Sequence, residues 1–349
     1  MTYTDLRREV SAAGLLDRSG WNLLPLGLVT ASLGVASVAI LAFAPGAWRL
    51  LAALTLEMFW IQIGFFGHDT GHNQVFERTE YNRRLGLLCF PFMLGMTFRP
   101  WVIKHNLHHA QTNILGEDPD IDHPVLAFSD EVARTRTGLM KYFVRYQAYA
   151  YPVLAFFATV GFRIDAWRYA SGNPAAAAKS DRYEHERKYE LLLLIGNVVL
   201  WVVVPSIFLG PLTWLPIFLI GQALLGFQMA FVFAPNHKGM PMYTDATNMS
   251  FLELQVLTSR NVTGGPLVDF MYGGLNYQVE HHLFPTMPRT NLGKCRDIVK
   301  RFCNTIDLLY TEESVYGSCK ILFETLDGIG RNVFLPAPIQ PSEVTVTTH

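Results

Sequence analysis

Eight of the eleven histidines in this chain fall into clusters whose spacing suits metal binding. In chain order the clusters are His68 and His72, then His105, His108 and His109, then His237 alone, then His281 and His282. Imidazole is a preferred ligand of iron, copper, nickel and zinc, and this number of rings is enough for two ions. The sequence therefore predicts a binuclear transition-metal site.

The spacing inside the clusters is that of helix faces. The first pair stands four residues apart, and the second cluster has members three and four residues after its first. Gln278, His281 and His282 repeat the second pattern, with glutamine where a ninth histidine would stand. Side chains three or four residues apart share one face of a helix, so each cluster predicts a helix that presents its ligands in one stripe.

Two roles stay open for Gln278. An amide oxygen is a weaker ligand for a transition metal than imidazole, so Gln278 either binds a metal, directly or through water, or donates a hydrogen bond to His281 or His282. Asn236 and Asn276 lie next to the clusters in the sequence and are candidates for supporting hydrogen bonds.

The three histidines outside the clusters have a simpler interpretation. An isolated histidine near a membrane surface commonly places its ring among apolar groups and its polar tip in water. We assign that role to His123, His185 and His349. The other eight histidines repeat a helical spacing, which favours a metal site over this simpler explanation.

The composition indicates an integral membrane protein. Half of the residues are apolar and 16% are charged, against roughly 25% charged in soluble domains. A net charge of −1 gives no sign of a nucleic-acid partner, and long apolar runs leave little of the 349 residues for a second soluble core. The cysteines lack C-x-x-C spacing, and we expect them to be reduced: Cys89, Cys295, Cys303 and Cys319.

Four stretches approach the roughly 20 apolar residues that cross a bilayer, namely 24–44, 50–67, 191–209 and 212–234. Short links join them into two hairpins. Basic residues gather after the second stretch, so by the positive-inside rule the loops that carry the histidines are cytoplasmic. The N-terminus lacks the apolar centre of a secretory signal and is expected on the same side.

Two further apolar stretches, 85–98 and 142–162, need a separate decision. A single crossing by either would place histidine clusters on opposite faces of the membrane, where they could not share one site. We therefore predict that 85–98 is interfacial or re-entrant, and that 142–162 is an interfacial helix.

These segments give one expected organisation: an all-α integral membrane protein of four transmembrane helices, with interfacial helices and a cytoplasmic helical cap that holds the metals. The single domain, 1–349, divides into a cytoplasmic N-terminal segment (1–23), a first hairpin (24–67), a region with two clusters and the interfacial helices (68–190), a second hairpin (191–234) and a cap segment with His237 and the third cluster (235–349).

An acidic run at 116–122 resembles part of a calcium loop. Asp118, Asp120 and Asp122 alternate as in an EF-hand, but the sixth position is His123 instead of glycine and the twelfth is Ser129 instead of glutamate. The run is thus expected to be a solvated turn or a support for the second histidine cluster.

Three histidine boxes resemble those of the membrane fatty acid desaturases. They read HDTGH at 68–72, HNLHH at 105–109 and QVEHH at 278–282, and the resemblance extends to HDTGHNQVF at 68–76, PNHKG around His237 and LNYQVEHHLFPTMPRTNL at 275–292. Glutamine at the head of the third box is the variant of front-end desaturases, which insert a double bond between an existing one and the carboxyl end.

The resemblance implies two iron ions, held by the eight histidines and, less firmly, by Gln278, with O2 as co-substrate. An unactivated methylene has no acidic proton, so the histidines act as ligands and not as bases. Zinc also binds imidazole and could replace iron in purified protein, where it would be inactive because it has no redox chemistry.

The resemblance also implies partners. The substrate would be a fatty acyl thioester or an acyl lipid within the bilayer. Many relatives with the glutamine variant carry a fused cytochrome b5 domain, whose His-Pro-Gly-Gly motif does not occur here. A separate electron donor of the ferredoxin, cytochrome b5 or flavin reductase type is therefore expected.

A basic stretch near the third box has two interpretations. It contains Arg289, Lys294, Arg296, Lys300 and Arg301. The simpler interpretation is a cytoplasmic face near anionic lipid, and the sharper one is a docking surface for an acidic electron carrier.

Two other functions compete with desaturation. A di-iron hydroxylase or ketolase would use the same histidines and leave oxygen in its product, but QVEHHLFP is closer to the desaturases. A metal transporter would place its ligands within the spanning helices or along a pathway, whereas these lie at helix ends.

Overall fold

The fold of this computed structural model is almost entirely helical. The structure describes residues 1–18, 20–172 and 184–335. Two short parallel strands are the exception in that part of the chain, β1 (Asn261–Thr263) beside β2 (Glu312–Ser314). The prediction of a helical protein is thus confirmed, apart from these six residues, which pair the segment before α14 (Pro266–Tyr272) with the segment before α17 (Val315–Asn332).

Four helical segments are long and apolar enough to cross a membrane, as the sequence predicted. They are Gly20–Phe43 with α2 (Leu24–Phe43), Gly46–Gly71 with α3 (Ala52–Gly71), His185–Leu209 with α10 (Glu184–Val198) and α11 (Val204–Leu209), and Pro211–His237, which is α12. Two of them extend further than predicted: α3 continues through the first histidine box to Gly71, and α12 ends on His237.

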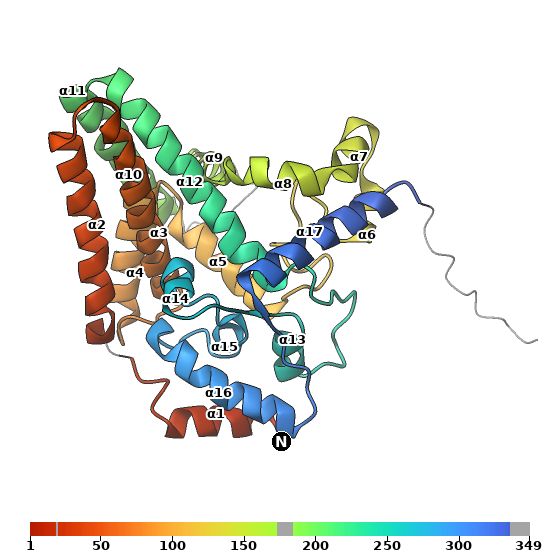
Figure 1. Ribbon diagram of the computed structural model, residues 1–349. Coiled ribbons are helices and arrows are strands. Elements are labelled where there is room, and N and C mark those ends of the chain that lie inside the picture. Colours follow the sequence, from red (N-terminus) through yellow and green to blue (C-terminus); the bar gives the residue numbers. More distant parts are fainter. Residues whose placement is uncertain (19, 173–183, 336–349) are drawn as a thin grey trace, which may run out of the picture.

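These four segments pack side by side into one bundle (Figure 1). Its interior is filled by large apolar side chains such as Trp60, Phe65, Trp214 and Ile217. The outward faces are apolar as well, since Val35 of α2 is 69% exposed and Phe208 of α11 is 82% exposed. Apolar surface this extensive on helices of this length suits contact with lipid, which agrees with the composition.

The stretch predicted to be interfacial or re-entrant forms the first half of a bent pair. Helix α4 (Thr79–Leu87) runs into the π-helical segment η3 (Leu88–Leu94), and α5 (Phe98–Ala110) follows at an angle of 109°. Gly95 makes the turn with a φ of 74°, a backbone conformation that favours glycine. This bend turns the chain back, so α5 lies beside the end of α3. How deeply the bent pair enters a membrane stays a prediction.

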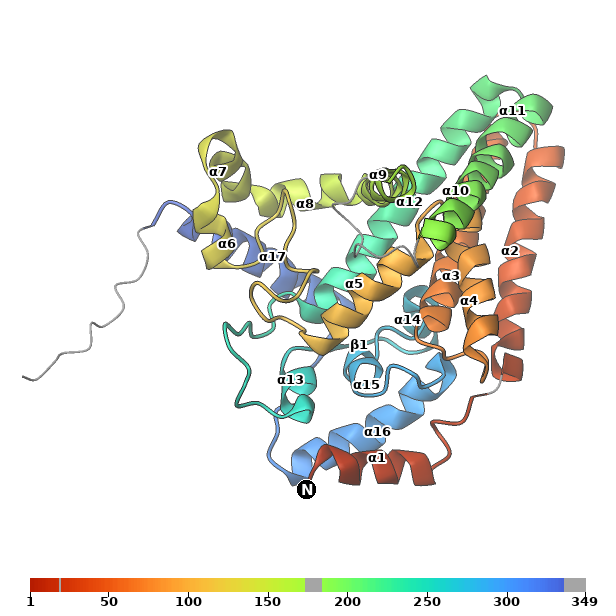
Figure 2. The ribbon, with the colours of Figure 1, turned by 180° about the vertical axis from the view of Figure 1, so that it is seen from behind.

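The prediction of one continuous helix over 142–162 is wrong, while the interfacial position of this segment stays a prediction. The chain forms three helices there, α7 (Gly138–Arg145), α8 (Gln147–Ala155) and α9 (Ala158–Ala170), which run from α7, away from the bundle, to α9 beside α12 (Figure 2). The first break falls where buried Gln147 bonds both backbone groups of Ala127 and the carbonyl of Leu326. These tertiary bonds fix the backbone at a place where the apolar pattern alone continues.

Helix α17 (Val315–Asn332) closes the same side of the molecule. It packs on α6 (Asp130–Thr135), α7 and α8, and on the last turns of α12. Leu322 and Leu326 enter an apolar core with Tyr151 and Phe128. The end of the chain that the structure describes is thereby tied to the helix that carries His237.

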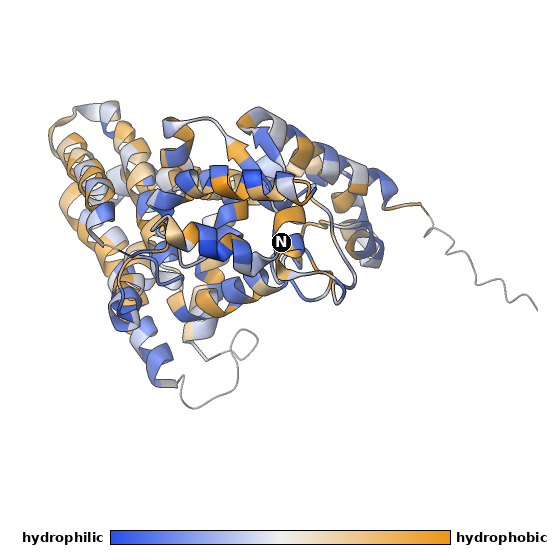
Figure 3. Cartoon of the chain, turned by 90° about the horizontal axis from the view of Figure 1, so that it is seen from below, coloured by the Kyte–Doolittle hydropathy of each residue, from blue (hydrophilic) through white to orange (hydrophobic). Residues whose placement is uncertain are grey.

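A layer of short helices lies beneath the bundle and covers the histidines. It contains α1 (Tyr3–Ala12), α13 (Phe251–Leu257), α14 (Pro266–Tyr272), α15 (Gln278–Leu283) and α16 (Arg289–Thr305). Leu6 and Val10 of α1 pack with Leu292 and Val299 of α16 in a core of their own. Seen from below, this layer mixes polar and apolar residues, unlike the bundle helices (Figure 3).

Candidate metal centre

All eight clustered histidines converge between the bundle and the layer beneath it. They come from four elements: α3 with the residue after it supplies His68 and His72, α5 supplies His105, His108 and His109, the end of α12 supplies His237, and α15 supplies His281 and His282. Seven of the rings are buried and that of His105 is half-buried. The helical stripes predicted from the spacing therefore face one another.

Four of these rings form what we call the first histidine group: His68, His72, His105 and His281. One ring nitrogen from each lies within 4.8 Å of the others. The Nε2 atoms of His68 and His105 are 3.1 Å apart, and the His68 and His281 ring centres are 4.7 Å apart. Nitrogen atoms gathered in this way can hold one metal ion.

Three further rings form the second histidine group: His108, His237 and His282. Their ring nitrogens also lie within 4.8 Å of one another. The amide nitrogen of Gln278, and not its oxygen, is 2.9 Å from Nε2 of His237, so the hydrogen bond predicted to His281 or His282 goes to His237 instead. The second group can hold a second ion, with the Gln278 amide at its edge.

His109 lies between the two groups. Its Nε2 is 3.2 Å from Nε2 of His105 in the first group, while its ring stacks on His282 of the second at 4.1 Å. The eight histidines therefore make one continuous cluster that contains two groups of metal-binding geometry, while a binuclear metal site stays a prediction.

The chemical state of the rings fits a metal. Burial lowers the pKa of His72 to about 3, and it lowers the pKa of His105, His109, His281 and His282 well below the ordinary value. Neutral imidazole is the form that binds metal. Several buried ring nitrogens have no hydrogen-bond partner among the described residues: Nε2 of His72 and His282, Nδ1 of His109 and both nitrogens of His281. Such atoms are costly unless an ion satisfies them.

Aromatic packing positions the first group, a feature that the sequence did not reveal. The Trp101 indole stacks on His105 with ring centres 4.5 Å apart. A Cβ atom on Gly71, inside the HDTGH box, would lie 2.5 Å from Trp101, and one on Gly67 would lie 2.1 Å from Phe90. Both positions require glycine because the aromatic side chains occupy that space.

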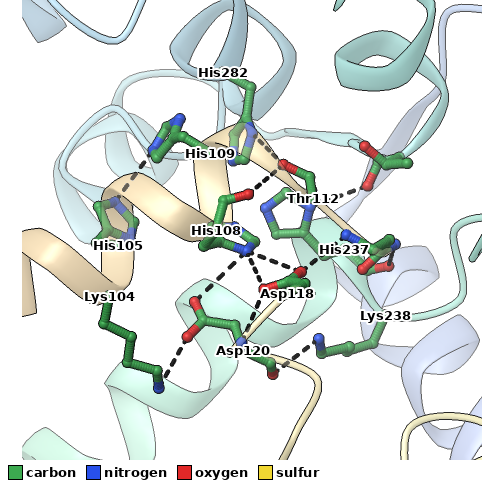
Figure 4. A network of polar contacts seen from close by, with 12 residues as sticks. Lys104, His105, His108, His109, Thr112, Asp118, Asp120, His237, Lys238 and His282 are labelled. Atoms are coloured by element: carbon green, nitrogen blue, oxygen red, sulfur yellow. Dashed lines mark hydrogen bonds and ion pairs between the residues drawn. The ribbon is translucent and has the colours of Figure 1, made fainter. Parts of the chain in front are cut away.

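A carboxylate positions the second group. Asp118 accepts a hydrogen bond from Nδ1 of His108, at 2.9 Å and 3.1 Å to its two oxygens (Figure 4). Burial raises the pKa of Asp118 and the bond from His108 lowers it, with a result of about 2, so the carboxyl is ionised. The interpretation of the acidic run as support for the second cluster is confirmed at Asp118. Asp120 pairs with Lys104 at 3.0 Å and lies 3.7 Å from the same nitrogen of His108, and Asp122 is exposed.

Three more supports were missed because they are distant in sequence. Nδ1 of His237 lies 3.0 Å from the carbonyl oxygen of Thr258, and Nδ1 of His282 lies 2.8 Å from Oε1 of Gln255. Thr112 is 3.1 Å from the same nitrogen of His282. No spacing rule connects Gln255 or Thr258 to the boxes. Thr112 follows the second box closely, but only the packed fold brings it to His282 of the third.

The two asparagines named from the sequence have different roles. Asn236 donates to Oε1 of Gln278 at 3.0 Å and thereby orients the amide toward His237. Asn276 bonds Asp269 and the carbonyl of Val262, away from the histidines. The supporting role is confirmed for Asn236 and wrong for Asn276, which braces the loop before the box.

Glu280 lies within the third box but faces away from the histidines. Its carboxyl accepts hydrogen bonds from Asn261 and from the Tyr310 hydroxyl, each at 2.7 Å. Burial raises the pKa of this fully buried carboxyl to about 7. Glu280 therefore holds α15 from behind while His281 and His282 face the site.

The basic stretch is largely paired and does not form a free cationic surface. Arg289 is buried 3.1 Å from Asp69 of the first box. Arg296 and Lys300 both contact Glu312, and Arg301 contacts Glu9. These pairings weaken the interpretation as a docking surface, because most of the positive charge is neutralised within the chain.

The remaining sequence predictions have mixed outcomes. His123 accepts hydrogen bonds from the backbone of Val125 and Leu126, outside the metal centre, and His185 is exposed. His349 lies outside the described residues. All four cysteines are free, as predicted.

Fold and site together define a helical membrane protein with a histidine-rich centre for metal. Comparison with known families agrees with this class, since the fatty acid desaturase model matches residues 28–314. The match covers most of the sequence, including all three histidine boxes. The chain belongs to the fatty acid desaturase family.

Several characterised proteins are similar to this chain. An acyl-lipid (9-3)-desaturase of Physcomitrium patens is 34% identical over 313 residues, which cover 84% of this chain and 56% of that protein. In Caenorhabditis elegans, the Delta(5) fatty acid desaturase fat-4 is 29% identical over 90% of this chain and 70% of its own length. The Delta(6)-fatty-acid desaturase fat-3 is 31% identical over 82% of this chain and 66% of its own. The chain thus spans 56% to 70% of the length of these three relatives.

Proposed function

We propose that this chain is an O2-dependent fatty acyl desaturase that inserts a cis double bond into an acyl chain. One observation carries the proposal: eight histidines from four separate elements meet in a chain of the desaturase family, and seven of them form two metal-sized groups. Seven of the rings are buried, and burial lowers the pKa of His72, His105, His109, His281 and His282, which favours the neutral form that ligands of a redox metal need.

The reaction removes two hydrogen atoms from neighbouring carbons. With O2, two electrons and two protons, the saturated segment becomes an alkene and two waters. Two bound iron ions would supply the oxidant for this C–H cleavage. The chain's histidines would hold the irons, while Asp118, Thr258 and Gln255 fix the imidazole tautomers of the second group.

Front-end regioselectivity is part of the proposal. The similar proteins are named as Delta(5), Delta(6), Delta(8) and (9-3) desaturases. In this chain Gln278 heads the third box and lies beside His237 of the second group. We propose that Gln278 contributes to the second metal position, directly or through water.

We further propose a membrane arrangement. The four apolar segments cross as two hairpins, 24–67 and 191–234, within one domain. The segments 1–23 and 235–349 lie on the cytoplasmic side, with the metal centre, and 68–190 supplies two boxes and the interfacial helices. Exposed apolar residues on α7 to α9, among them Leu139, Tyr149 and Val153, support contact of that arm with lipid.

The substrate and the donor follow from the same chemistry. A fatty acyl thioester or an acyl lipid would present its chain to the centre from the bilayer. Electrons would come from a separate protein of the ferredoxin, cytochrome b5 or flavin reductase type.

Product analysis tests this function. Cells that express the chain would be fed saturated and polyunsaturated fatty acids, and their lipids analysed by gas chromatography and mass spectrometry, beside a His281→Ala control. We expect a new double bond on the carboxyl side of an existing one, absent in the control. Hydroxylated acids without a new alkene would contradict desaturation, and a double bond on the methyl side would contradict front-end selectivity. A supplied reductase would accompany a parallel sample.

A further inference from the structure

In the second histidine group, Nδ1 of every ring bonds an oxygen acceptor from outside the group. Nδ1 of His108 bonds the Asp118 carboxylate, Nδ1 of His237 bonds the Thr258 carbonyl, and Nδ1 of His282 bonds Oε1 of Gln255. All three acceptors are oxygen atoms that cannot donate, since Gln255 uses its nitrogen elsewhere. Each Nδ1 therefore carries the proton and each Nε2 keeps its lone pair, which in His237 accepts a hydrogen bond from the Gln278 amide nitrogen at 2.9 Å.

The acceptors are themselves fixed in place. Asp118 accepts the backbone N–H groups of Asn113 and Asp120, each at 2.8 Å. Gln255 is fully buried and donates from Nε2 to the carbonyl of His109 at 2.9 Å. Because the supports do not depend on a metal, the second group already has its binding geometry without one.

The first histidine group lacks such supports in the part of the chain that the structure describes. Nδ1 of His68 is 4.0 Å from Asp69, whose other oxygen pairs with Arg289. Both ring nitrogens of His281 are unpartnered, and so is Nε2 of His72. Its rings are positioned by packing against Trp101 and against one another, which leaves their tautomers free.

Charge adds to this difference. The carboxylate of Asp118 lies directly behind the second group. Its negative charge favours a divalent cation and makes Nε2 of His108 a more basic metal ligand. The carboxylate nearest the first group, that of Asp69, is paired with the Arg289 guanidinium. A cation entering the first group gains less from its surroundings.

We infer that the two metal positions are unequal: the second histidine group binds its ion first and more tightly, and the first group is the exchangeable position. Loss of a hydrogen-bond partner behind a ligand lowers metal affinity by about 10- to 100-fold. A difference of about that size is expected between the groups. The inference rests on the proposed metal centre and assigns Asp118 as the positioning residue that makes the second group the stronger one.

Stepwise metal binding tests the inference. The full chain, purified in detergent and stripped of metal, would be titrated with Co2+ alone without O2, against a competing chelator. Bound Co2+ per chain and its visible absorption are the readouts. Two steps are expected, the first at least about tenfold tighter. His282→Ala should remove the tight step, and His72→Ala the weak one.

Asp118→Asn is the decisive variant, because it removes the acceptor charge with almost no change in shape. It should weaken the tight step by about 10- to 100-fold and leave the weak step unchanged. Asp120→Asn is the matched control: its carboxylate is 3.7 Å from the same nitrogen and is engaged by Lys104, so we expect a change of less than about threefold. An unchanged gel-filtration profile shows that each variant is folded.

The outcomes separate this inference from the proposed function. Two Co2+ ions bound with one affinity, or an Asp118→Asn variant that weakens both steps alike, would overturn the inference and leave the metal centre intact. Wild-type protein that binds no Co2+ would overturn both. Equal losses in Asp118→Asn and Asp120→Asn would show a general charge effect and would also overturn it.

Discussion

The two histidine groups use different means to hold the same kind of ligand. In the first group, the rings are confined by shape, because Trp101 fills the space above Gly71 and stacks on His105. In the second group, every ring is tied through Nδ1 to an oxygen acceptor. Packing fixes where a ring lies, whereas a hydrogen bond also fixes which nitrogen is the ligand. The comparison predicts that steric changes affect the first group and polar changes affect the second.

Gly71→Ala should have the largest effect and should act on the first group. The new Cβ would lie 2.5 Å from Trp101, so the indole must move and His105 moves with it. Displacement of a catalytic group by about 1 Å lowers rates by about 100-fold, and overpacking costs about 1–3 kcal/mol of stability. Product formation in fed cells and the melting temperature of purified protein measure the two effects.

Gly161→Ala provides the control for this steric change. It also replaces a helical glycine, but nothing lies within 4 Å of the new Cβ. It should retain full product formation. Equal activity in both variants would show that Trp101 does not confine the first group.

Gln255→Leu should have the next largest effect and should act on the second group. Leucine fills a similar volume but cannot accept the hydrogen bond of His282 or donate to the carbonyl of His109. Affinity for the tightly bound ion should fall by at least about tenfold, measured by chelator competition. Gln255→Glu keeps the acceptor and serves as its control. A weakened first group with an intact second group would reverse the comparison.

Glu280→Gln should have the smallest effect on metal and should treat both groups alike. Helix α15 contributes His281 to one group and His282 to the other, and Glu280 braces this helix through Asn261 and Tyr310. Glutamine preserves the shape of the brace. The affinity of each group for its ion should therefore stay the same as in the wild type.

The same variant makes a prediction about pH. Burial raises the pKa of Glu280 from 4.5 to about 7 in the folded protein. The stability that this group contributes is present below pH 4.5 and is lost as pH rises through about 7. Wild type should lose about 3 kcal/mol relative to Glu280→Gln between pH 4.5 and pH 8. Melting curves that stay parallel for the two proteins over this range would contradict the assignment.

Much of the centre could be predicted from the sequence because its ligands follow helix periodicity. The spacing of His105, His108 and His109 specifies one face of one helix, and the apolar stretches specify which helix ends that face must meet. Because the clusters must share one site, neither 85–98 nor 142–162 was expected to cross the membrane. Local rules of this kind need no knowledge of the tertiary fold.

The supports behind the ligands could not be predicted in the same way. Gln255 and Thr258 lie on or after a short helix far from any box, and the reason for Gly71 is the position of Trp101, thirty residues later. The break before Gln147 depends on bonds to Ala127 and Leu326. Such contacts arise only when segments far apart in sequence pack together, and periodicity carries no information about them.

Anomalous diffraction from crystals of the full chain, at the iron and zinc absorption edges, tests the central claim most directly. The account predicts two peaks: one surrounded by His68, His72, His105 and His281, and the other by His108, His237 and His282. The second peak should be the stronger one after brief soaking in a chelator. A single peak, or peaks away from these rings, would contradict a binuclear centre held in two different ways.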